Sequence, residues 1–329
     1  MPQLRIVGVH LAGAATRKSA VVRALAPLNS IYSGAEPGPI HDLFSSSLNS
    51  FFPSIRVQSG APSIKPSPLL WEAFSSEIGA IAKKDSDTRL IEVVQDMGGA
   101  DIFVIDAPLS LPPCTKCELL CPGTFQCKVP EVELFLQEWN DRRKKDGKQR
   151  NPQPYVDRFF EMFARNQFEH ELLNGGFEFE AALGANKAPL TLRAMRLNRE
   201  IKMHFPNALI LESNSLVAAM GWSFQTGYKI NSLIELRNSV QGIESRAGLL
   251  KKLEQMRIAT RAATLHPELF QDLAEHAELF LAAMSALSAW ALLNGEALLN
   301  LDFLQLNKNH PLNGWACLPK DSINSVQKN

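Results

Sequence analysis

Apolar and polar positions along this chain predict strands near its start, followed by strands that alternate with helices. Apolar residues dominate 4–12 and 19–28, and both segments are typical of strands that pair with each other. A continuous apolar run at 102–105 indicates a central strand that is covered on both faces, and the run at 208–211 indicates a second buried strand. Residues 55–58 alternate between apolar and polar and indicate one more strand.

Helical spacing of apolar residues is the second pattern in the chain. It predicts helices over 69–82, 86–97, 156–173, 231–258 with a break at Gly242, and 273–293. Strands that come early and then alternate with helices favour an α/β fold with a mixed sheet. Binding and active sites in such sheets lie beyond the carboxyl ends of the strands. Asp106 and Glu212 each follow a buried apolar run, so we expect two carboxylates at that edge.

Residues 113–184 depart from this alternation of strands and helices. They contain four of the chain's five cysteines, a basic stretch and a Phe-rich helical segment. We interpret them as an insertion on one edge of the main fold. The predicted organisation is a discontinuous main domain, 1–112 and 185–305, with the insertion at 113–184 and a C-terminal tail at 306–329.

The four clustered cysteines predict a site for a soft metal ion. Their spacing of two, three and five intervening residues supplies four thiolates within one short segment, at Cys114, Cys117, Cys121 and Cys127. Tetrahedral thiolate coordination suits zinc, and an iron–sulfur cluster would use the same ligands. We expect a structural zinc ion, because four protein ligands leave no open position for a substrate. Four reduced surface thiols are the alternative interpretation.

The composition is typical of a globular protein but does not indicate what the protein binds. The chain has 329 residues, of which 45% are hydrophobic and 21% charged, as in ordinary globular proteins. Lys+Arg and Asp+Glu both number 34, so net charge neither favours nor excludes nucleic acid. No apolar run reaches the ~18 residues of a membrane span, and the N-terminus lacks a secretory pattern. We therefore expect a cytoplasmic protein with reduced cysteines and no membrane partner.

Four motifs carry a resemblance to a known family. They are GVHLAG at 8–13, IDAPLSLP at 105–112, PYVDR at 154–158 and ESNS at 212–215. Their order resembles that of an uncharacterised family of predicted nucleases with a ribonuclease H-like fold. One branch of that family also has a Cys-rich segment ending in Cys-Pro-Gly, as at 121–123 here. The resemblance implies a ribonuclease H-like mixed sheet flanked by helices, with a Cys-rich, mainly helical insertion.

The resemblance also implies a metal-dependent nuclease or phosphodiesterase acting on nucleic acid. By position, the family's acidic residues correspond to His10, Asp106, Glu212 and Glu278. Phosphodiester hydrolysis at such a site uses two hard cations, Mg²⁺ or Mn²⁺, held by converging carboxylates. This chain departs from the family at His10, where an aspartate is expected, and around Glu278. A histidine nitrogen suits Mn²⁺, Fe²⁺ or Zn²⁺ better than Mg²⁺.

Other hypotheses stay open for these residues. His10 indicates either a changed metal preference or a lost catalytic centre, and in the second case a degenerate member that binds nucleic acid or protein. Asp106 and Glu212 also suit turn and helix capping, and Glu278 suits the wet edge of a helix. An ATP-using enzyme is a third function class, with support only from shared fold topology.

Basic and aromatic residues after the cysteines predict a surface for nucleic acid. Lysines and arginines cluster at 141–150, where a solvated loop is the alternative interpretation. Beside a nuclease site they would contact phosphates. Tyr155 and Arg158 would add a stacking ring and a guanidinium for a single strand. The predicted contact residues are Arg142, Arg143, Lys144, Lys145, Tyr155 and Arg158.

Overall fold

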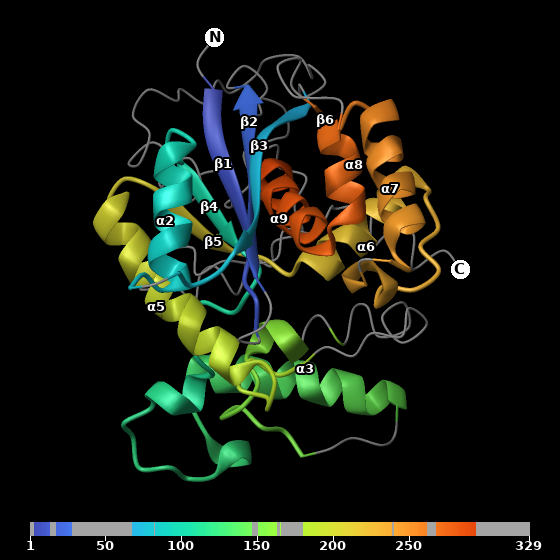
Figure 1. Ribbon diagram of the computed structural model, residues 1–329. Coiled ribbons are helices and arrows are strands. Elements are labelled where there is room, and N and C mark those ends of the chain that lie inside the picture. The colour runs from blue at the N-terminus through green and yellow to red at the C-terminus, as the bar shows by residue number, and fades with distance from the viewer. Residues whose placement is uncertain are drawn as a thin grey trace, which may run out of the picture.

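Six strands form one mixed sheet in the order β5-β4-β1-β2-β3-β6 (Figure 1). The computed structural model describes residues 3–13, 18–27, 68–81, 83–146, 151–162, 165, 180–238, 240–261 and 268–293. Within these ranges the strands are β1 (Gln3–His10), β2 (Ser19–Pro27), β3 (Leu69–Ile78), β4 (Ile102–Ile105), β5 (Leu209–Glu212) and β6 (Ala259–Arg261). The chain is therefore an α/β protein, as predicted.

The directions of the strands bring three carboxyl ends to one edge of the sheet. β1 pairs antiparallel with β2, and β2 pairs antiparallel with β3. β4 lies parallel to β1, β5 parallel to β4, and β6 parallel to β3. In this register Val9 lies opposite Ile105, and Ile105 lies opposite Glu212. The residues that end β1, β4 and β5 are consequently neighbours.

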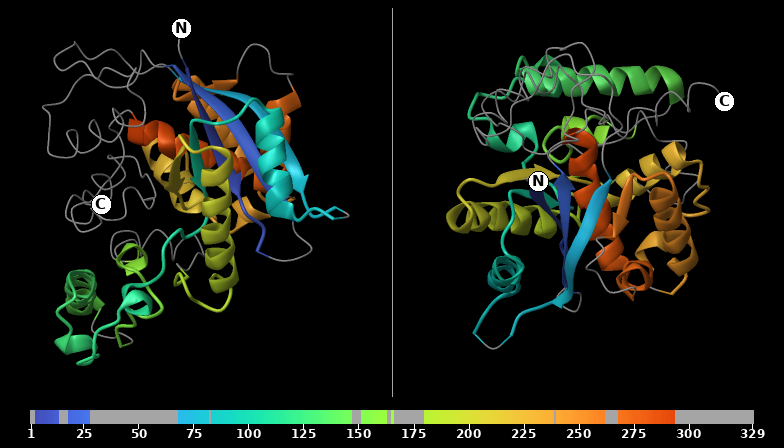
Figure 2. Two further views of the ribbon diagram at one scale, coloured as in Figure 1. Left: turned by 90° about the vertical axis from the view of Figure 1, so that its left-hand side faces the viewer. Right: turned by 90° about the horizontal axis from the view of Figure 1, so that it is seen from above.

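Helices cover both faces of the sheet (Figure 2). Alternation along β1 sends Val7 and Val9 into one apolar layer and Leu4 and Ile6 into the other, because successive strand side chains point to opposite faces. The layer with Val7 contains α2 (Ser86–Asp96) and α5 (Ala188–His204). The other contains α6 (Ser215–Thr226), α7 (Ile243–Gln255), α8 (Glu268–Glu275) and α9 (Ala277–Leu293).

The cysteine segment lies beyond the carboxyl ends of β1, β4 and β5, at the lower end of Figure 1. It contains the short 3₁₀ helices η2 (Pro113–Lys116) and η3 (Thr124–Gln126), followed by α3 (Pro130–Asp146). No described residue between β4 and α5 adds a strand to the sheet. Among the described residues, no helix has the length and apolar character needed to cross a membrane.

Several predicted elements are confirmed, and others are wrong. The strands at 4–12, 19–28, 102–105 and 208–211 and the helix at 86–97 correspond to β1, β2, β4, β5 and α2. The predicted helix at 69–82 is instead strand β3, which pairs along its length with β2. Its apolar spacing fits a helix locally, but the free edge of β2 supplies a ladder that overrides that preference.

The remaining differences are at element boundaries. Only η4 (Glu235–Arg237) and α7 are helical within 231–258, and the short edge strand β6 follows. The predicted helix at 273–293 is two helices, α8 and α9, that meet at His276. The predicted strand at 55–58, most of the predicted helix at 156–173 and the tail at 306–329 lie outside the described residues.

Candidate functional site

Asp106 lies directly after β4 and is held by groups from two neighbouring elements. Its Oδ1 accepts a hydrogen bond from the backbone N–H of Ser215 at 2.9 Å. Its Oδ2 accepts one from the Ser215 hydroxyl at 2.5 Å and lies 2.8 Å from Nδ1 of His10. His10 ends β1 and Ser215 begins α6, capped by the Asn214 side chain. Three chain segments therefore meet at one carboxylate.

This carboxylate is buried and yet ionised. Burial opposes its charge, but the hydrogen bond and charge of His10, the charge of Lys187 and the Ser215 hydroxyl together hold the pKa of Asp106 well below its usual range. Lys187 directly precedes α5. Burial lowers the pKa of the Lys187 ammonium, and the negative charge of Asp106 opposes that shift. Asp106 is thus a buried negative group with two nitrogen-bearing neighbours, His10 and Lys187.

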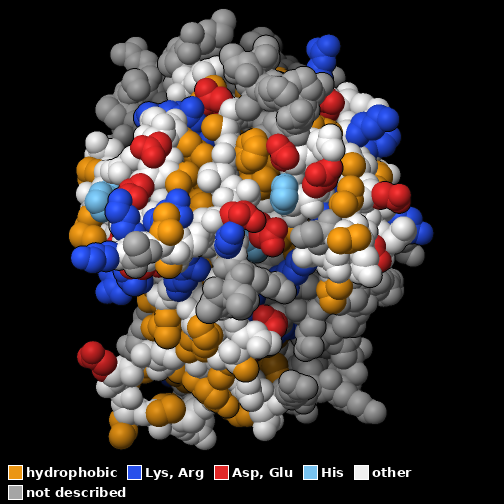
Figure 3. Space-filling model, in the orientation of Figure 1, with side chains coloured by type: hydrophobic (Ala, Val, Ile, Leu, Met, Phe, Trp, Pro, Cys, Tyr) orange, Lys and Arg blue, Asp and Glu red, His pale blue; other side chains and the backbone are white. Residues whose placement is uncertain are grey.

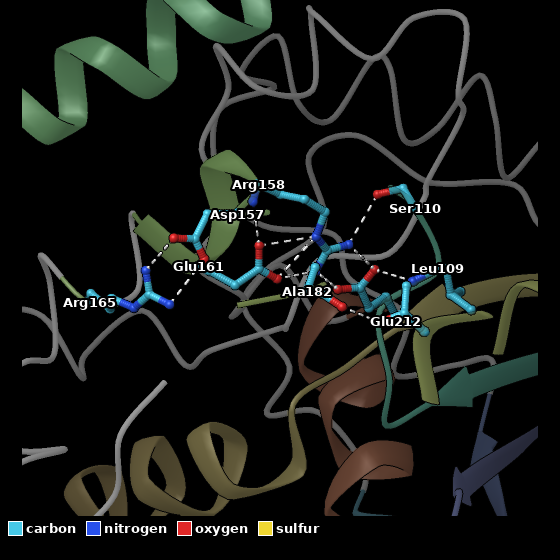
Figure 4. A network of polar contacts seen from close by, with 9 residues as sticks. Leu109, Ser110, Asp157, Arg158, Glu161, Arg165, Ala182 and Glu212 are labelled. Carbon is cyan, nitrogen blue, oxygen red and sulfur yellow. Dashed lines mark hydrogen bonds and ion pairs between the residues drawn. The ribbon is translucent and has the colours of Figure 1, made fainter. Parts of the chain in front are cut away.

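Glu212, the last residue of β5, is held in a separate buried network (Figure 4). Nη1 of Arg158 donates to its Oε2 at 2.8 Å, and Nη2 donates to its Oε1 at 2.6 Å. The backbone N–H of Leu109 donates to Oε2 at 2.8 Å. Arg158 also donates to both carboxylate oxygens of Glu161 and to the Ser110 hydroxyl. One guanidinium therefore bridges two buried carboxylates.

The pKa shifts in this network reflect two buried carboxylates that share one guanidinium. Burial works against the charged guanidinium, but the charges of Glu161 and Glu212 raise the pKa of Arg158. Burial also raises the pKa of Glu212, against the opposing charge of Arg158. Three donors already occupy the Glu212 carboxylate, which distinguishes it from an open cation ligand.

Arg158 differs from its predicted role as a nucleic-acid contact. Its side chain is buried and committed to Glu161 and Glu212, because the PYVDR motif folds against the end of β5. Tyr155 is 52% exposed and remains compatible with the predicted surface. The side chains of Arg142, Arg143, Lys144 and Lys145, in the last turns of α3, lie outside the described residues.

Glu278 is in the first turn of α9 and partly exposed. Its negative charge acts on Arg246, where burial lowers the pKa to about 10 and Glu278 opposes the shift. Within the described part of the chain, no hydrogen bond or ion pair joins Glu278 to His10, Asp106 or Glu212. Nor does that part contain three or more His, Cys, Asp or Glu side chains placed to hold a metal ion.

The four predicted zinc ligands lie near one another but do not form such a group. Cys114 and Cys127 are partly buried, Cys117 and Cys121 are exposed, and all four are free thiols. Burial raises the pKa of the Cys114 thiol, and the other three cysteines add to the shift through their charge. Figure 3 shows hydrophobic side chains gathered at this end of the molecule, and Leu119, Leu120 and Phe125 are exposed there.

The sequence analysis missed two groups at the site, Lys187 and Ser215. Lys187 sits in a short polar connection before α5, and its proximity to Asp106 depends on how that connection folds. The contact of Ser215 was within reach of the sequence, because Asn214-Ser215 after a buried strand is a helix-start pattern at the same edge.

Comparisons with known proteins do not assign this site to a family. No known protein family matches the chain, and neither a curated protein nor a solved structure matches it. The function is therefore inferred from the residues of the site themselves.

Proposed function

We propose that this protein hydrolyses phosphodiester bonds in nucleic acid at the edge of the sheet where His10 and Asp106 meet. The contact between these two residues, 2.8 Å long, is the observation that carries the proposal. The family resemblance named both among four site positions, and they lie 96 residues apart in the chain. The strand order and directions are compatible with a ribonuclease H-like fold, which supports assigning the sheet to that type.

The chemistry needs a base for water and a positive environment for the phosphate. In hydrolysis the water oxygen bonds to phosphorus, the bond from phosphorus to the leaving oxygen breaks, and one proton passes from the water to a base. His10 offers a ring nitrogen, and the Lys187 charge near Asp106 suits an anionic substrate. A bound Mg²⁺ or Mn²⁺ would stabilise the charge that develops on the phosphate.

The donor set at this edge fits such a cation only in part. Glu212 is occupied by Arg158 and Leu109. Asp106 has hydrogen-bond partners in Ser215 and His10. Water and substrate oxygens would have to complete the coordination, as they commonly do for Mg²⁺.

Nucleic acid is the proposed partner on grounds of placement and charge. The last turns of α3 carry four consecutive basic residues, 142–145, and α3 lies on the side of the molecule toward which the carboxyl ends of β1, β4 and β5 point (Figure 1). An exposed Tyr155 lies in the segment that follows α3 and can stack on a base.

We also propose that the four clustered cysteines bind a structural zinc ion. Their thiols are free, and the other three influence the ionisation of Cys114. They are not yet placed as a tetrahedral set, so binding would draw Cys117 and Cys121 inward from their exposed positions. An iron–sulfur cluster would use the same thiolates.

Cleavage of labelled single- and double-stranded DNA and RNA, with Mg²⁺ and separately with Mn²⁺, tests the proposal. His10→Ala and Asp106→Ala should each lower the rate by about 10²-fold or more, the usual worth of a positioned base. Asp101→Ala is the matched control, because Asp101 precedes the opposite end of β4 and pairs with Arg5. Full activity of folded Asp106→Ala, or an inactive wild type with both ions, contradicts the proposal.

A second function, binding nucleic acid without cleaving it, is favoured by the state of Glu212. Its carboxylate is saturated by Arg158 and Leu109, and the described residues lack a three-ligand metal group. A degenerate protein of this kind would bind labelled strands with an affinity that falls steeply as salt rises. Salt-sensitive binding without turnover would establish this function instead of hydrolysis.

A further inference from the structure

The contact between Asp106 and His10 uses Nδ1 of the imidazole. A carboxylate only accepts hydrogen bonds, so Nδ1 must carry the proton that joins the two side chains. In a neutral imidazole the other nitrogen, Nε2, then presents a lone pair. The identity of the contacting atom thus selects one tautomer of His10 and leaves Nε2 as the basic nitrogen.

Ser215 holds the Asp106 carboxylate in place for this contact. The backbone N–H of Ser215 donates to Oδ1, and its hydroxyl donates to Oδ2, the oxygen that also receives His10. Asp106 therefore receives three hydrogen bonds from protein groups and keeps little free capacity for a cation. Carboxylates bound in this way orient a histidine in many enzymes, where they act through the ring and not on the substrate.

The solvent exposure of the two side chains also suggests that His10, and not Asp106, would face the substrate. The Asp106 side chain is 9% exposed and the His10 side chain 20%, so the ring lies nearer to solvent than the carboxylate behind it. Lys187 adds a positive charge close enough to act on Asp106. An anionic phosphodiester would meet the histidine before the aspartate.

We infer that Asp106 is a positioning residue for His10 and not a cation ligand, and that Nε2 of His10 accepts the proton of the attacking water. The inference rests on the proposed hydrolysis. The water oxygen bonds to phosphorus, its proton moves to Nε2, and the leaving oxygen departs with the electrons of the broken bond. The proton on Nε2 then passes to that leaving oxygen, so the imidazole returns to its starting state.

Asp106→Asn is the discriminating variant. If the amide oxygen keeps the Ser215 N–H, the amide NH₂ faces Nδ1 of His10 and donates to it. Nδ1 then becomes an acceptor, the proton moves to Nε2, and the base is lost although the shape is unchanged. Nitrogen-15 NMR of the labelled full-length protein reads the tautomer directly, with His10→Gln identifying the His10 signals among those of the seven histidines.

The expected result is protonated Nδ1 in the wild type, protonated Nε2 in Asp106→Asn, and a fall in kcat of about 10²–10⁴-fold with little change in KM. Mn²⁺ affinity, measured by isothermal titration, should change less than about threefold, because a positioning residue does not bind the ion. Ser215→Ala, which keeps the backbone donor, should show a smaller loss of kcat and serves if Asp106→Asn does not fold.

Two outcomes overturn the inference. A wild-type signal with the proton on Nε2 would mean that Asp106 does not select the tautomer. A loss of Mn²⁺ binding in Asp106→Asn without a change of tautomer would make Asp106 a direct ligand. Absence of cleavage by the wild type would defeat the proposed function and the role of Nε2 as base. The tautomer measurement needs no substrate and would still decide whether Asp106 positions His10.

Discussion

At the scale of single residues, the strongest constraint near the site is the arginine that two carboxylates share. Arg158 reaches 54 residues along the chain to Glu212 and pairs with Glu161 three residues away. Burying one cation between two anions is stable only while all three hydrogen-bond one another, because an unpaired buried charge is costly. The network ties the segment after α3 to the end of β5.

Replacing Arg158 with methionine should destabilise the protein by about 3–5 kcal/mol at pH 8, because two buried carboxylates lose their partner. Burial already raises the pKa of Glu212, and loss of the cation raises it further. The folded state then binds protons more readily than the unfolded state, so the deficit shrinks as pH falls through that raised pKa. Urea unfolding at pH 8 and pH 5 measures both values.

The control for this substitution is Arg196→Met. Arg196 pairs with Asp85 and Glu200 but is half exposed, so solvent screens its ion pairs. We expect a change under about 1 kcal/mol with little dependence on pH. A deficit in Arg158→Met that equals that of Arg196→Met, or that grows toward pH 5, would contradict the described network.

At the scale of elements, the placement of α9 on the sheet depends on one glycine in β1. A Cβ atom at Gly8 would overlap the backbone oxygen of Ala282 and lie 2.7 Å from the backbone nitrogen of Ala286. Backbone atoms cannot move aside as flexible side chains do. The absence of a side chain at Gly8 therefore lets α9 pack directly on the strand that carries His10.

Gly8→Ala should destabilise the protein by about 3 kcal/mol, since α9 must move away from β1 to make room. Gly13→Ala is the matched control, because a Cβ atom there meets nothing within 4 Å. Thermal unfolding of both variants measures the difference. Equal melting temperatures would mean that α9 does not approach β1 as closely as described.

Element type was predictable wherever burial on both faces produced a continuous apolar run, as for β4 and β5. The prediction of element type was wrong for β3. Its buried residues Leu69 and Trp71 alternate with less buried ones only over the first few residues of the strand. The choice between helix and strand there depended on β2, which lies some forty residues earlier in the chain. The spacing of apolar residues within 69–82 does not show that such a partner strand exists.

At the scale of the whole molecule, the residues of the candidate site and the clustered cysteines lie at one end of the sheet. The carboxyl ends of the parallel strands, the buried Arg158 network and the cysteine segment all lie there (Figure 1). Phe125 beside Cys127 packs against Trp139 of α3, with ring centroids 5.6 Å apart. The cysteine segment is thus anchored to a helix, although its thiols are not drawn together.

Zinc binding should complete that arrangement. We expect about one zinc ion per chain by elemental analysis of protein purified without chelator, the stoichiometry of a four-cysteine structural site. Removal of the ion should lower the melting temperature, because a ligand that binds only the folded state stabilises it. Cys117→Ser should lose the ion, whereas Cys317→Ser, outside the segment, should retain it. Iron with visible absorbance would indicate a cluster instead.

The sequence by itself determined the fold class and the strands β1, β2, β4 and β5. These features follow from local hydrophobic runs and from motifs that stay close to strand ends. Tertiary structure alone decided that Arg158 is buried, that Glu212 is its partner and that the charge of Glu278 acts on Arg246. Those outcomes depend on which distant segments bring opposite charges together in the interior, and a local sequence pattern does not contain that information.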